Sequence, residues 1–403
     1  MSILHFLFFY LLTLSTIVVA QKRTDMFPDQ KVVNRLMDDE IKKSDLPAVV
    51  AVAISTKNQE LIYSSGKAIW DQEEKVTPNH IFQIMSMTKV LTSIAVLQLV
   101  EKGLVGLDDD LSSWLPEMAA IPILSKGRLT KAKNPITLRH LLTHTSGFGY
   151  RGTDKELATF KTDDWKYKDL PRRFESGTQF LYGSSTNWVG RLVEKISKTD
   201  LENYFRENLT GPLNMDRTWF NVPDSLKKFI VSRGARGYDG KQPLTELPNR
   251  IRTGSVTEYA GDGGLYSSPY DYTLLLKCLL DYGRVGNIVI LKKETLLEMS
   301  KNQIGDIVME KKGAYFDPGN CCSFKGLFSS TTKWGLAWMI DNEDKSYGPR
   351  SGTVLWGGSF NTFFFIDFKS GIAASIYTQH RPFNHPATTL LFNRFSEILY
   401  FGK

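Results

Sequence analysis

Apolar positions near the start of the chain follow a helical period first and a strand-like pattern just after it. Five apolar residues recur at helical spacing: Val32, Val33, Leu36, Met37 and Ile41. Pro47 ends this pattern, a valine-rich apolar run covers residues 48–54, and residues 60–64 follow across a polar turn. This order predicts a helix followed by an antiparallel hairpin.

The end of the chain has the same combination in the reverse order. Residues 362–368 and 372–378 are apolar runs on either side of a short Lys-Ser-Gly connection, which predicts a second hairpin. A last helix is expected over residues 386–400, because Pro386 suits a first helical turn. Four apolar residues share one face of that helix: Leu391, Phe395, Ile398 and Leu399.

The middle of the chain has a different pattern. Helical stretches such as residues 138–142, 185–196 and 270–282 are joined there by long polar connections. We therefore expect an α/β (α+β) protein, in which an antiparallel sheet is built from both chain ends and flanked by helices, with an inserted and mostly helical domain. The predicted division assigns residues 24–80 and 325–403 to the sheet domain and residues 81–324 to the helical domain.

Residues 90–100 form a helical pattern that is apolar on nearly all sides. Such a helix cannot lie on a surface, so it should run through the interior of the protein. Gly103, directly after Glu101 and Lys102, suits its C-terminal end. Ser86 then sits at the start of this buried helix, and Lys89 projects from the same face three residues later.

This placement suits nucleophilic catalysis. A serine hydroxyl is a weak nucleophile until a neighbouring base takes its proton, and burial shifts an ammonium group toward the neutral amine that acts as a base. The same serine-x-x-lysine spacing occurs at residues 64–67, 225–228 and 330–333, but only Ser86 opens a buried helix. The alternative is that Ser86 caps the helix and that Lys89 extends to solvent.

The first twenty residues contain no Asp, Glu, Lys or Arg, and residues 3–20 are almost wholly apolar. Val18-Val19-Ala20 before Gln21 fits a small-residue cleavage site, which predicts a secretory signal peptide over residues 1–20. About 18 apolar residues can also cross a bilayer, so an uncleaved anchor is the alternative. We expect a secreted or periplasmic protein that contacts a membrane only if residues 3–20 stay attached.

Composition narrows the class of protein further. With 42% hydrophobic and 23% charged residues, the chain has the composition of a globular protein with a substantial core. Its 50 basic and 43 acidic residues are interspersed, which argues against a nucleic-acid partner despite a net charge of +7. The histidines and cysteines show no zinc-ligand spacing, so we expect neither metal nor cofactor.

The chain has three cysteines, an odd number that excludes full pairing within one chain. Cys278 lies within an apolar helical stretch and is expected to be a buried thiol. A single bridge from Cys278 to Cys321 or Cys322 is the alternative.

Three further stretches carry candidate chemistry. Tyr182 is either a second proton carrier beside a lysine or an ordinary tyrosine in a turn. Gly357 and Gly358, a glycine pair in a strand pattern, indicate close approach by a ligand or another element, or else a bulge. His144 is expected to tether a loop. No Gly-x-Ser-x-Gly motif occurs, which argues against an α/β-hydrolase with a catalytic triad.

Taken together and in this order, these pieces resemble the serine β-lactamase-like family, which includes class C β-lactamases, D,D-peptidases and β-lactamase-like esterases. Serine-x-x-lysine is a signature of β-lactamases and penicillin-binding proteins. The likeness covers roughly residues 25–400 and rests on six stretches: residues 82–103, 107–116, 136–148, the Tyr182 segment, 263–269 and 356–358.

The resemblance implies a role for each matching residue. Ser86 would be the acylated nucleophile, and Lys89 and Tyr182 would share proton transfer. The backbone N–H groups of Ser86 and Ser359 would form the oxyanion hole. The substrate-binding residues implied by the tyrosine motif and by the third motif, on the sheet edge, are Ser184, Trp356, Gly357, Gly358 and Ser359.

Two departures from the family pattern concern the substrate. The tyrosine motif usually ends in asparagine, which suits a substrate amide, whereas this chain has Ser184. The third motif begins with lysine in β-lactamases and with histidine in some D,D-peptidases, and those donors suit a substrate carboxylate. Trp356 offers only an indole N–H and an apolar face, and tryptophan-x-glycine resembles the esterase branch. Arg381 is a residue that would restore anion binding if it lay nearby.

The sequence therefore predicts a serine hydrolase that forms an acyl-enzyme on Ser86 and cleaves esters of small acyl groups. The first alternative is a D,D-peptidase or β-lactamase that acts on amides. The second is a catalytically silent protein that binds peptidoglycan fragments or serves as a scaffold. Under either of the two enzyme hypotheses, the substrate is a small-molecule ester or amide.

Overall fold

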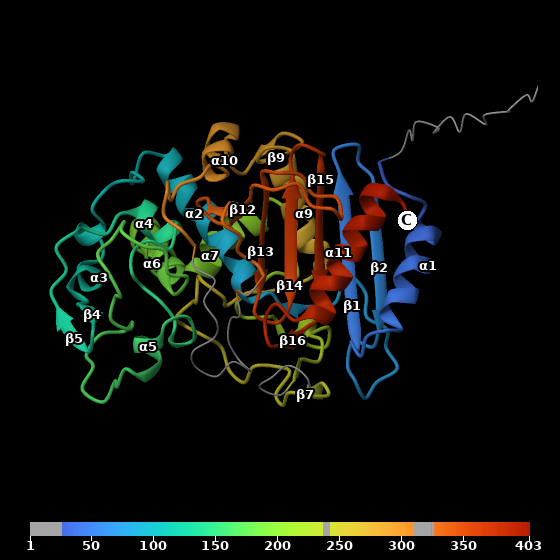
Figure 1. Ribbon diagram of the computed structural model, residues 1–403, viewed down its shortest axis with the longest axis horizontal. Helices are drawn as coiled ribbons and strands as arrows, with labels where there is room; N and C mark the ends of the chain where they lie inside the picture. Colours follow the sequence, from blue (N-terminus) through green and yellow to red (C-terminus); the bar gives the residue numbers. More distant parts are fainter. Residues whose placement is uncertain (1–25, 237–241, 310–323, 325) are drawn as a thin grey trace, which may run out of the picture.

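The computed structural model describes residues 26–236, 242–309, 324 and 326–403 (Figure 1). The predicted leader, residues 1–20, lies outside the described residues, and so do Cys321 and Cys322. Within the part that is described, no helix is long and apolar enough to cross a membrane.

A seven-stranded antiparallel sheet joins the two ends of the chain, in the order β11-β12-β13-β14-β15-β1-β2. Both predicted hairpins are present, and β1 pairs with β15 so that Val50 lies opposite Tyr377. The predicted fold class is therefore confirmed. The strands are β1 (Ala48–Ser55), β2 (Glu60–Gly66), β11 (Lys333–Trp334), β12 (Met339–Asp341), β13 (Thr353–Gly358), β14 (Thr362–Asp367) and β15 (Ile372–Tyr377).

Helices cover both faces of this sheet. Helices α1 (Gln30–Ile41) and α11 (Pro386–Phe401) pack together on one face, and α9 (Pro269–Leu280) packs against β1 and β15 on the other (Figure 1). Every residue of β1 is buried. A strand covered on both faces has to be apolar throughout, which explains the continuous valine-rich run in place of an alternating pattern.

Most of the remaining helices lie beyond β12 and β13, whereas β7 and β16 lie below the sheet and β9 above it in the view of Figure 1. The helices are α2 (Thr88–Glu101), α3 (Pro116–Ala120), α4 (Leu138–Leu142), α5 (Lys155–Thr159), α6 (Ser185–Ser197), α7 (Leu201–Phe205), α8 (Asp224–Lys227) and α10 (Lys293–Met299), with the 3₁₀ turns η1 (Met85–Met87), η2 (Leu111–Ser113) and η3 (Arg151–Thr153) and the π-helix η4 (Arg206–Thr210). The short strands are β3 (Phe82–Gln83), β4 (Ile123–Ser125), β5 (Arg128–Thr130), β6 (Gly234–Ala235), β7 (Thr245–Glu246), β8 (Tyr266–Ser267), β9 (Arg284–Val285), β10 (Ile288–Val289) and β16 (His380–Arg381).

Helix α2 runs through the interior, as the apolar pattern predicts. Its residues from Thr88 to Leu97 are all buried, and it packs against α6 and α7. Gly103 follows its last turn with a φ of 69°, in the left-handed region that glycine adopts without strain. The helix therefore holds the side chains of its first turn at the centre of the molecule.

Helix α9 lies within residues 81–324, yet it packs on the large sheet, where Tyr272 contacts Phe364. The assignment of residues 81–324 to a separate helical domain stays a prediction. Cys278 of α9 is a buried free thiol, and burial raises its pKa to about 12.

Candidate active site

Ser86 lies in η1, a 3₁₀ helix one turn long that directly precedes α2. The predicted helix start is thus a tighter turn than expected, and Met85 within it has a φ of 47°. A non-glycine residue in this left-handed region is strained and persists only where its surroundings hold it. Tyr272 donates a hydrogen bond to the Met87 carbonyl at 3.2 Å, and Thr362 donates one to the Ile84 carbonyl at 3.4 Å. The turn is therefore fixed from α9 and from the sheet.

Lys89 is 1% exposed, and its ammonium nitrogen has three close polar neighbours. Its Nζ lies 3.3 Å from Ser86 Oγ, 3.1 Å from the Tyr150 hydroxyl and 2.7 Å from the backbone carbonyl of Asp262. It also lies 4.8 Å from the ring centroid of Tyr182. The alternative that Lys89 extends to solvent is wrong.

The hydrogen-bond partners of Lys89 show where its protons go. A backbone carbonyl can only accept, so Lys89 donates to Asp262. Tyr150 donates its own proton to the Asp262 carboxylate, and its oxygen therefore accepts from Lys89. Two N–H groups are then in use, and the third position of the nitrogen faces Ser86. In the neutral amine that position is a lone pair, which is what removal of the Ser86 proton requires.

Tyr150 and Asp262 were missed by sequence reasoning. The only local signal was that Tyr150 follows the His144 stretch and that Asp262 precedes a glycine pair. The structure places Asp262 through α2 itself, because Thr92, one turn after Lys89, donates to the Gly261 carbonyl at 2.6 Å.

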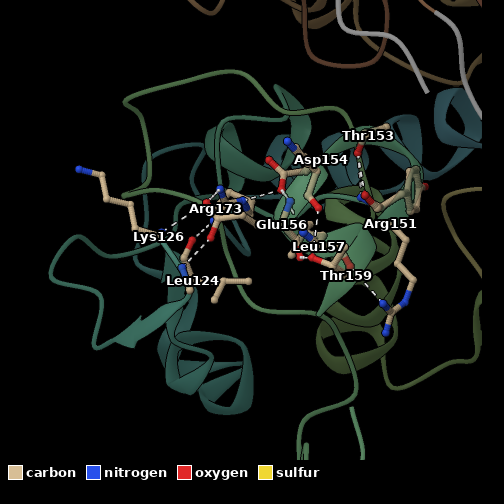
Figure 2. Close-up of polar contacts among 12 residues, drawn as sticks. Leu124, Lys126, Arg151, Thr153, Asp154, Glu156, Leu157, Thr159 and Arg173 are labelled. Carbon is tan, nitrogen blue, oxygen red and sulfur yellow. Dashed lines mark hydrogen bonds and ion pairs between the residues drawn. The ribbon is translucent and has the colours of Figure 1, made fainter. Parts of the chain in front are cut away.

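Tyr150 is held by the segment that follows it. Its N–H donates to the hydroxyl of Thr153 at 2.9 Å. The next residues are anchored by Arg173, which lies 2.7 Å from Asp154 and 2.6 Å from Glu156 and also donates to the Leu124 carbonyl (Figure 2). Arg173 precedes the Tyr182 segment in the chain. Its side chain therefore links the segment that contains Tyr150 to the segment that contains Tyr182.

Trp356 lies in β13 and contacts Tyr182. It is 2% exposed, and its indole N–H donates to the Tyr182 hydroxyl at 3.0 Å. Its ring packs against Trp334, Phe324 and Phe328. The N–H is thus donated inside the protein and the ring packs against aromatic neighbours, and the role of Trp356 as a substrate-binding residue stays a prediction.

Ser184 also has an internal partner, since its hydroxyl donates to Asp169 at 2.6 Å. Asp169 accepts a second bond, from the Trp188 indole at 2.8 Å. Burial raises the pKa of Asp169 above its ordinary value, and these two donors oppose the rise. Ser184 remains a predicted substrate-binding residue only through the lone pairs of its oxygen.

Gly357 and Gly358 allow β13 to pass close to its neighbours. A Cβ on Gly358 would lie 2.2 Å from the Ile84 carbonyl oxygen, two residues before Ser86, and one on Gly357 would lie 2.4 Å from the Phe363 ring. The pair therefore marks close approach by another element, one of the expected alternatives. Ser359 follows at the end of β13, so the predicted oxyanion hole is flanked by two segments in contact.

His144 is buried, and burial together with the nearby Lys89 holds its pKa well below the ordinary value. The imidazole is therefore uncharged. Its Nδ1 accepts from the Gly183 N–H at 3.4 Å, and its carbonyl accepts from the Leu181 N–H at 2.9 Å. His144 tethers the loop that carries Tyr182, as expected.

No group of three or more His, Cys, Asp or Glu side chains that could hold a metal ion occurs in the part of the chain that the structure describes. Beside Ser86, Lys89 lies over the rings of Tyr150 and Tyr182, and Tyr182 in turn contacts the Trp356 indole.

This arrangement defines a serine-hydrolase type of enzyme, and comparison with known proteins identifies its family. The model of the Beta-lactamase family matches residues 33–396, so the chain belongs to that family. A curated relative, monacolin J acid methylbutanoyltransferase of Aspergillus terreus, is 28% identical over 343 residues, which cover 79% of this chain and 81% of the relative. Lovastatin esterase of Penicillium rubens is 28% identical over 320 residues, which cover 72% of this chain and 77% of the relative.

Solved structures share the fold. A mutant simvastatin synthase from Aspergillus terreus superposes with a TM-score of 0.77 at 25% identity, over 91% of this chain and 93% of that one. A β-lactamase/D-alanine carboxypeptidase from Yersinia pestis gives a TM-score of 0.66 at 21% identity, over 92% and 99% of the two chains. The protein is therefore an enzyme of the serine-hydrolase type, and the names of its relatives describe an acyltransferase and an esterase.

Replacing Tyr150 by Phe tests whether that hydroxyl orients Lys89. The variant removes one acceptor from a buried amine, and hydrogen bonds to charged groups contribute about 1.5–3 kcal/mol. We expect kcat/KM for p-nitrophenyl butyrate to fall about 10- to 100-fold, together with a melting temperature lower by a few degrees.

The matched control is Tyr270→Phe, which removes the hydroxyl of a tyrosine that is 46% exposed. That variant should keep the wild-type rate. A Tyr150→Phe enzyme as fast as the Tyr270→Phe enzyme would contradict the assigned role.

Proposed function

We propose that this protein is a carboxylesterase for small acyl esters and that it works through an acyl-enzyme on Ser86. The observation that carries the proposal is the 3.3 Å contact between Ser86 Oγ and Lys89 Nζ, a nitrogen that also donates to the Tyr150 hydroxyl and to the Asp262 carbonyl. A serine that only capped a helix would need no buried amine aimed at its oxygen.

In the proposed mechanism Lys89 takes the Ser86 proton as Oγ attacks the ester carbonyl. The backbone N–H groups of Ser86 and Ser359 stabilise the oxyanion, a contribution that is often the largest single one in acyl transfer. The alcohol leaves, and water then attacks the acyl-enzyme. An alcohol in place of water would give acyl transfer, the reaction that the name of the Aspergillus terreus relative describes.

The preference for esters rests on Trp356. Relatives that bind a substrate carboxylate have a charged or strongly donating residue at this position, whereas the indole is neutral and its N–H is given to Tyr182. A buried anion without a charged partner is costly to desolvate. The printed name of the Penicillium rubens relative, an esterase, supports the same preference.

The alternative function, hydrolysis of amides by a D,D-peptidase or β-lactamase, also has an observation in its favour. The guanidinium carbon of Arg381 lies 4.9 Å from the ring centroid of Phe360, the residue after Ser359. Arg381 thus contacts the residue that follows the predicted oxyanion-hole residue Ser359, and a cation near that hole would favour a substrate carboxylate.

We also propose that residues 1–20 direct the protein out of the cytoplasm and are then removed. N-terminal sequencing of the mature protein tests this, and an intact N-terminus would favour the anchor.

Lys89→Arg tests the role of the amine as a base. Arginine keeps the positive charge but does not lose a proton in proteins, so this variant should be as slow as Lys89→Ala. General base catalysis contributes about 10²- to 10⁴-fold, and a loss of that size is expected in kcat. Ser86→Ala is the reference for complete loss, with the fold checked by circular dichroism. Near-normal turnover by the arginine variant would show that Lys89 is only an electrostatic partner.

The ester preference is tested by comparing kcat/KM for p-nitrophenyl butyrate and nitrocefin. The missing charge-assisted contact should reduce the rate with the β-lactam by about 10- to 150-fold. Arg381→Gln supplies the control, because it should slow nitrocefin selectively only if Arg381 binds the carboxylate. A faster reaction with nitrocefin would overturn the ester preference in favour of the β-lactamase alternative.

A further inference from the structure

A glutamine side chain takes the place of a neighbouring strand beside the residues that lead to Ser86. Gln379 lies two residues after β15, and its Oε1 accepts a hydrogen bond from the Gln83 N–H at 2.9 Å. Its Nε2 donates to the Gln83 carbonyl at 3.5 Å. A side-chain amide offers a donor and an acceptor as a peptide group does. Gln379 therefore completes the backbone hydrogen bonds of Gln83 at one edge of β3.

This edge of β3 faces away from β8. Along a strand, the N–H and C=O groups of successive residues point to alternate sides. The Ile84 N–H donates to the Leu265 carbonyl at 3.2 Å, on the β8 side, whereas Ile81 pairs with Ile230 on the opposite side. Gln83 shares the side of Ile81, two residues earlier. The Gln379 amide thus continues, with a side chain, a pairing that the backbone begins.

The segment that contains Gln379 also fixes the turn that follows Ser359. The His380 N–H donates to the Phe360 carbonyl at 3.0 Å. Asn361 is fully buried, and its Nδ2 donates to the carbonyls of His380 and Pro382, both at 2.7 Å. The turn after Ser359 is therefore attached to the same short continuation of β15 that holds the residues before the nucleophile.

Gln379 is held in a conformation that costs free energy. It is 3% exposed, and its φ of 55° lies in the left-handed region that side chains rarely adopt. Its carbonyl accepts from the Gly234 N–H of β6 at 2.9 Å, which fixes the backbone at this residue. Strain of this kind persists only where the surroundings determine the conformation, and it is concentrated at functional sites. The direction in which the Gln379 side chain leaves the backbone is thus fixed by the sheet.

Resting on the proposed acyl-enzyme at Ser86, we propose that Gln379 is a positioning residue that sets the separation of the two oxyanion-hole N–H groups. These donors belong to Ser86 and Ser359, which lie on different segments, so a third element has to hold both. Residues 378–382 do so, through Gln379 on the Ser86 side and through His380 on the Ser359 side. The negative charge on the carbonyl oxygen develops in the transition state, and an error of about 1 Å in the position of a catalytic group costs on the order of 10²-fold in rate.

The test compares two esters that differ in one atom, p-nitrophenyl butyrate and the thiono ester in which sulfur replaces its carbonyl oxygen. Sulfur is larger than oxygen and accepts hydrogen bonds more weakly, so the oxyanion hole accelerates the oxygen ester more than the thiono ester. Gln379→Met keeps the length of the side chain and removes its amide. We expect this variant to lower kcat/KM for the oxygen ester about 10- to 100-fold. The ratio of kcat/KM for the oxygen ester to that for the thiono ester should fall about 10-fold.

Gln379→Asn is the second variant. Asparagine tolerates the left-handed region better than most side chains, and its amide falls one methylene group short of Gln83. This variant should lower the ratio in the same direction with less risk to folding, so it decides the question if Gln379→Met fails to fold.

Gln98→Met is the matched control. Gln98 also holds backbone groups with its amide, because its Nε2 donates to the carbonyls of Asn208 at 3.1 Å and Ile290 at 2.9 Å. It lies near the C-terminal end of α2, at the opposite end of the helix from Ser86. The control variant should have a lower melting temperature and an unchanged ratio of the two rates. A ratio that falls equally in Gln98→Met and in the Gln379 variants would show a general effect of instability and would overturn the proposal.

An unchanged ratio in a folded Gln379 variant would also overturn the proposal, as would a wild-type enzyme with no preference for the oxygen ester. Failure of both variants to fold would do the same, because Gln379 would then be a requirement of the whole fold. Labelling with a fluorophosphonate separates these outcomes from a failure of the proposed function. No label on Ser86 of the wild-type protein would mean that the proposed function fails, whereas labelling together with an unchanged ratio would mean that this inference alone fails.

Discussion

The three hydrogen-bond positions of one buried amine impose the main constraint on this structure. Lys89 is enclosed at the first turn of α2, where water cannot complete its hydrogen bonds, so the protein has to supply each partner. The Asp262 carbonyl and the Tyr150 hydroxyl fill two positions, and Ser86 faces the third. The buried helix and the strained turn before it serve to present Ser86 and Lys89 in this geometry.

The second constraint comes from the sheet. The glycine pair in β13 lets the strand pass against the turn that carries Ser86, and Trp356 in the same strand reaches Tyr182. A neutral hydrogen-bond donor at position 356 changes the chemistry of the site without changing the backbone that surrounds it. A lysine there would put a second cation beside the phenol and near any substrate carboxylate, whereas the indole supplies one directed N–H and no charge. The fold is shared with β-lactamases, and the proposed preference for esters rests on this local difference.

Local patterns in the sequence account for much of this result. The two hairpins, the last helix and the buried helix after Ser86 all follow from apolar periodicity, which reports which faces are covered. Ser86 and Lys89 are one turn apart, so their contact is also a local property. Tyr150 and Asp262 lie 61 and 173 residues from Lys89, and no local pattern shows that the chain brings them together. The partner of Trp356 was hidden for the same reason, because an indole N–H can face a substrate or a neighbour with equal ease.

Chemical labelling shows which serine is the nucleophile. The wild-type protein and the Ser86→Ala variant are treated with a fluorophosphonate, digested and mapped by mass spectrometry. We expect one adduct per wild-type molecule, on the peptide that contains Ser86, and none on the variant. An adduct on another serine, or labelling that survives in Ser86→Ala, would contradict this expectation.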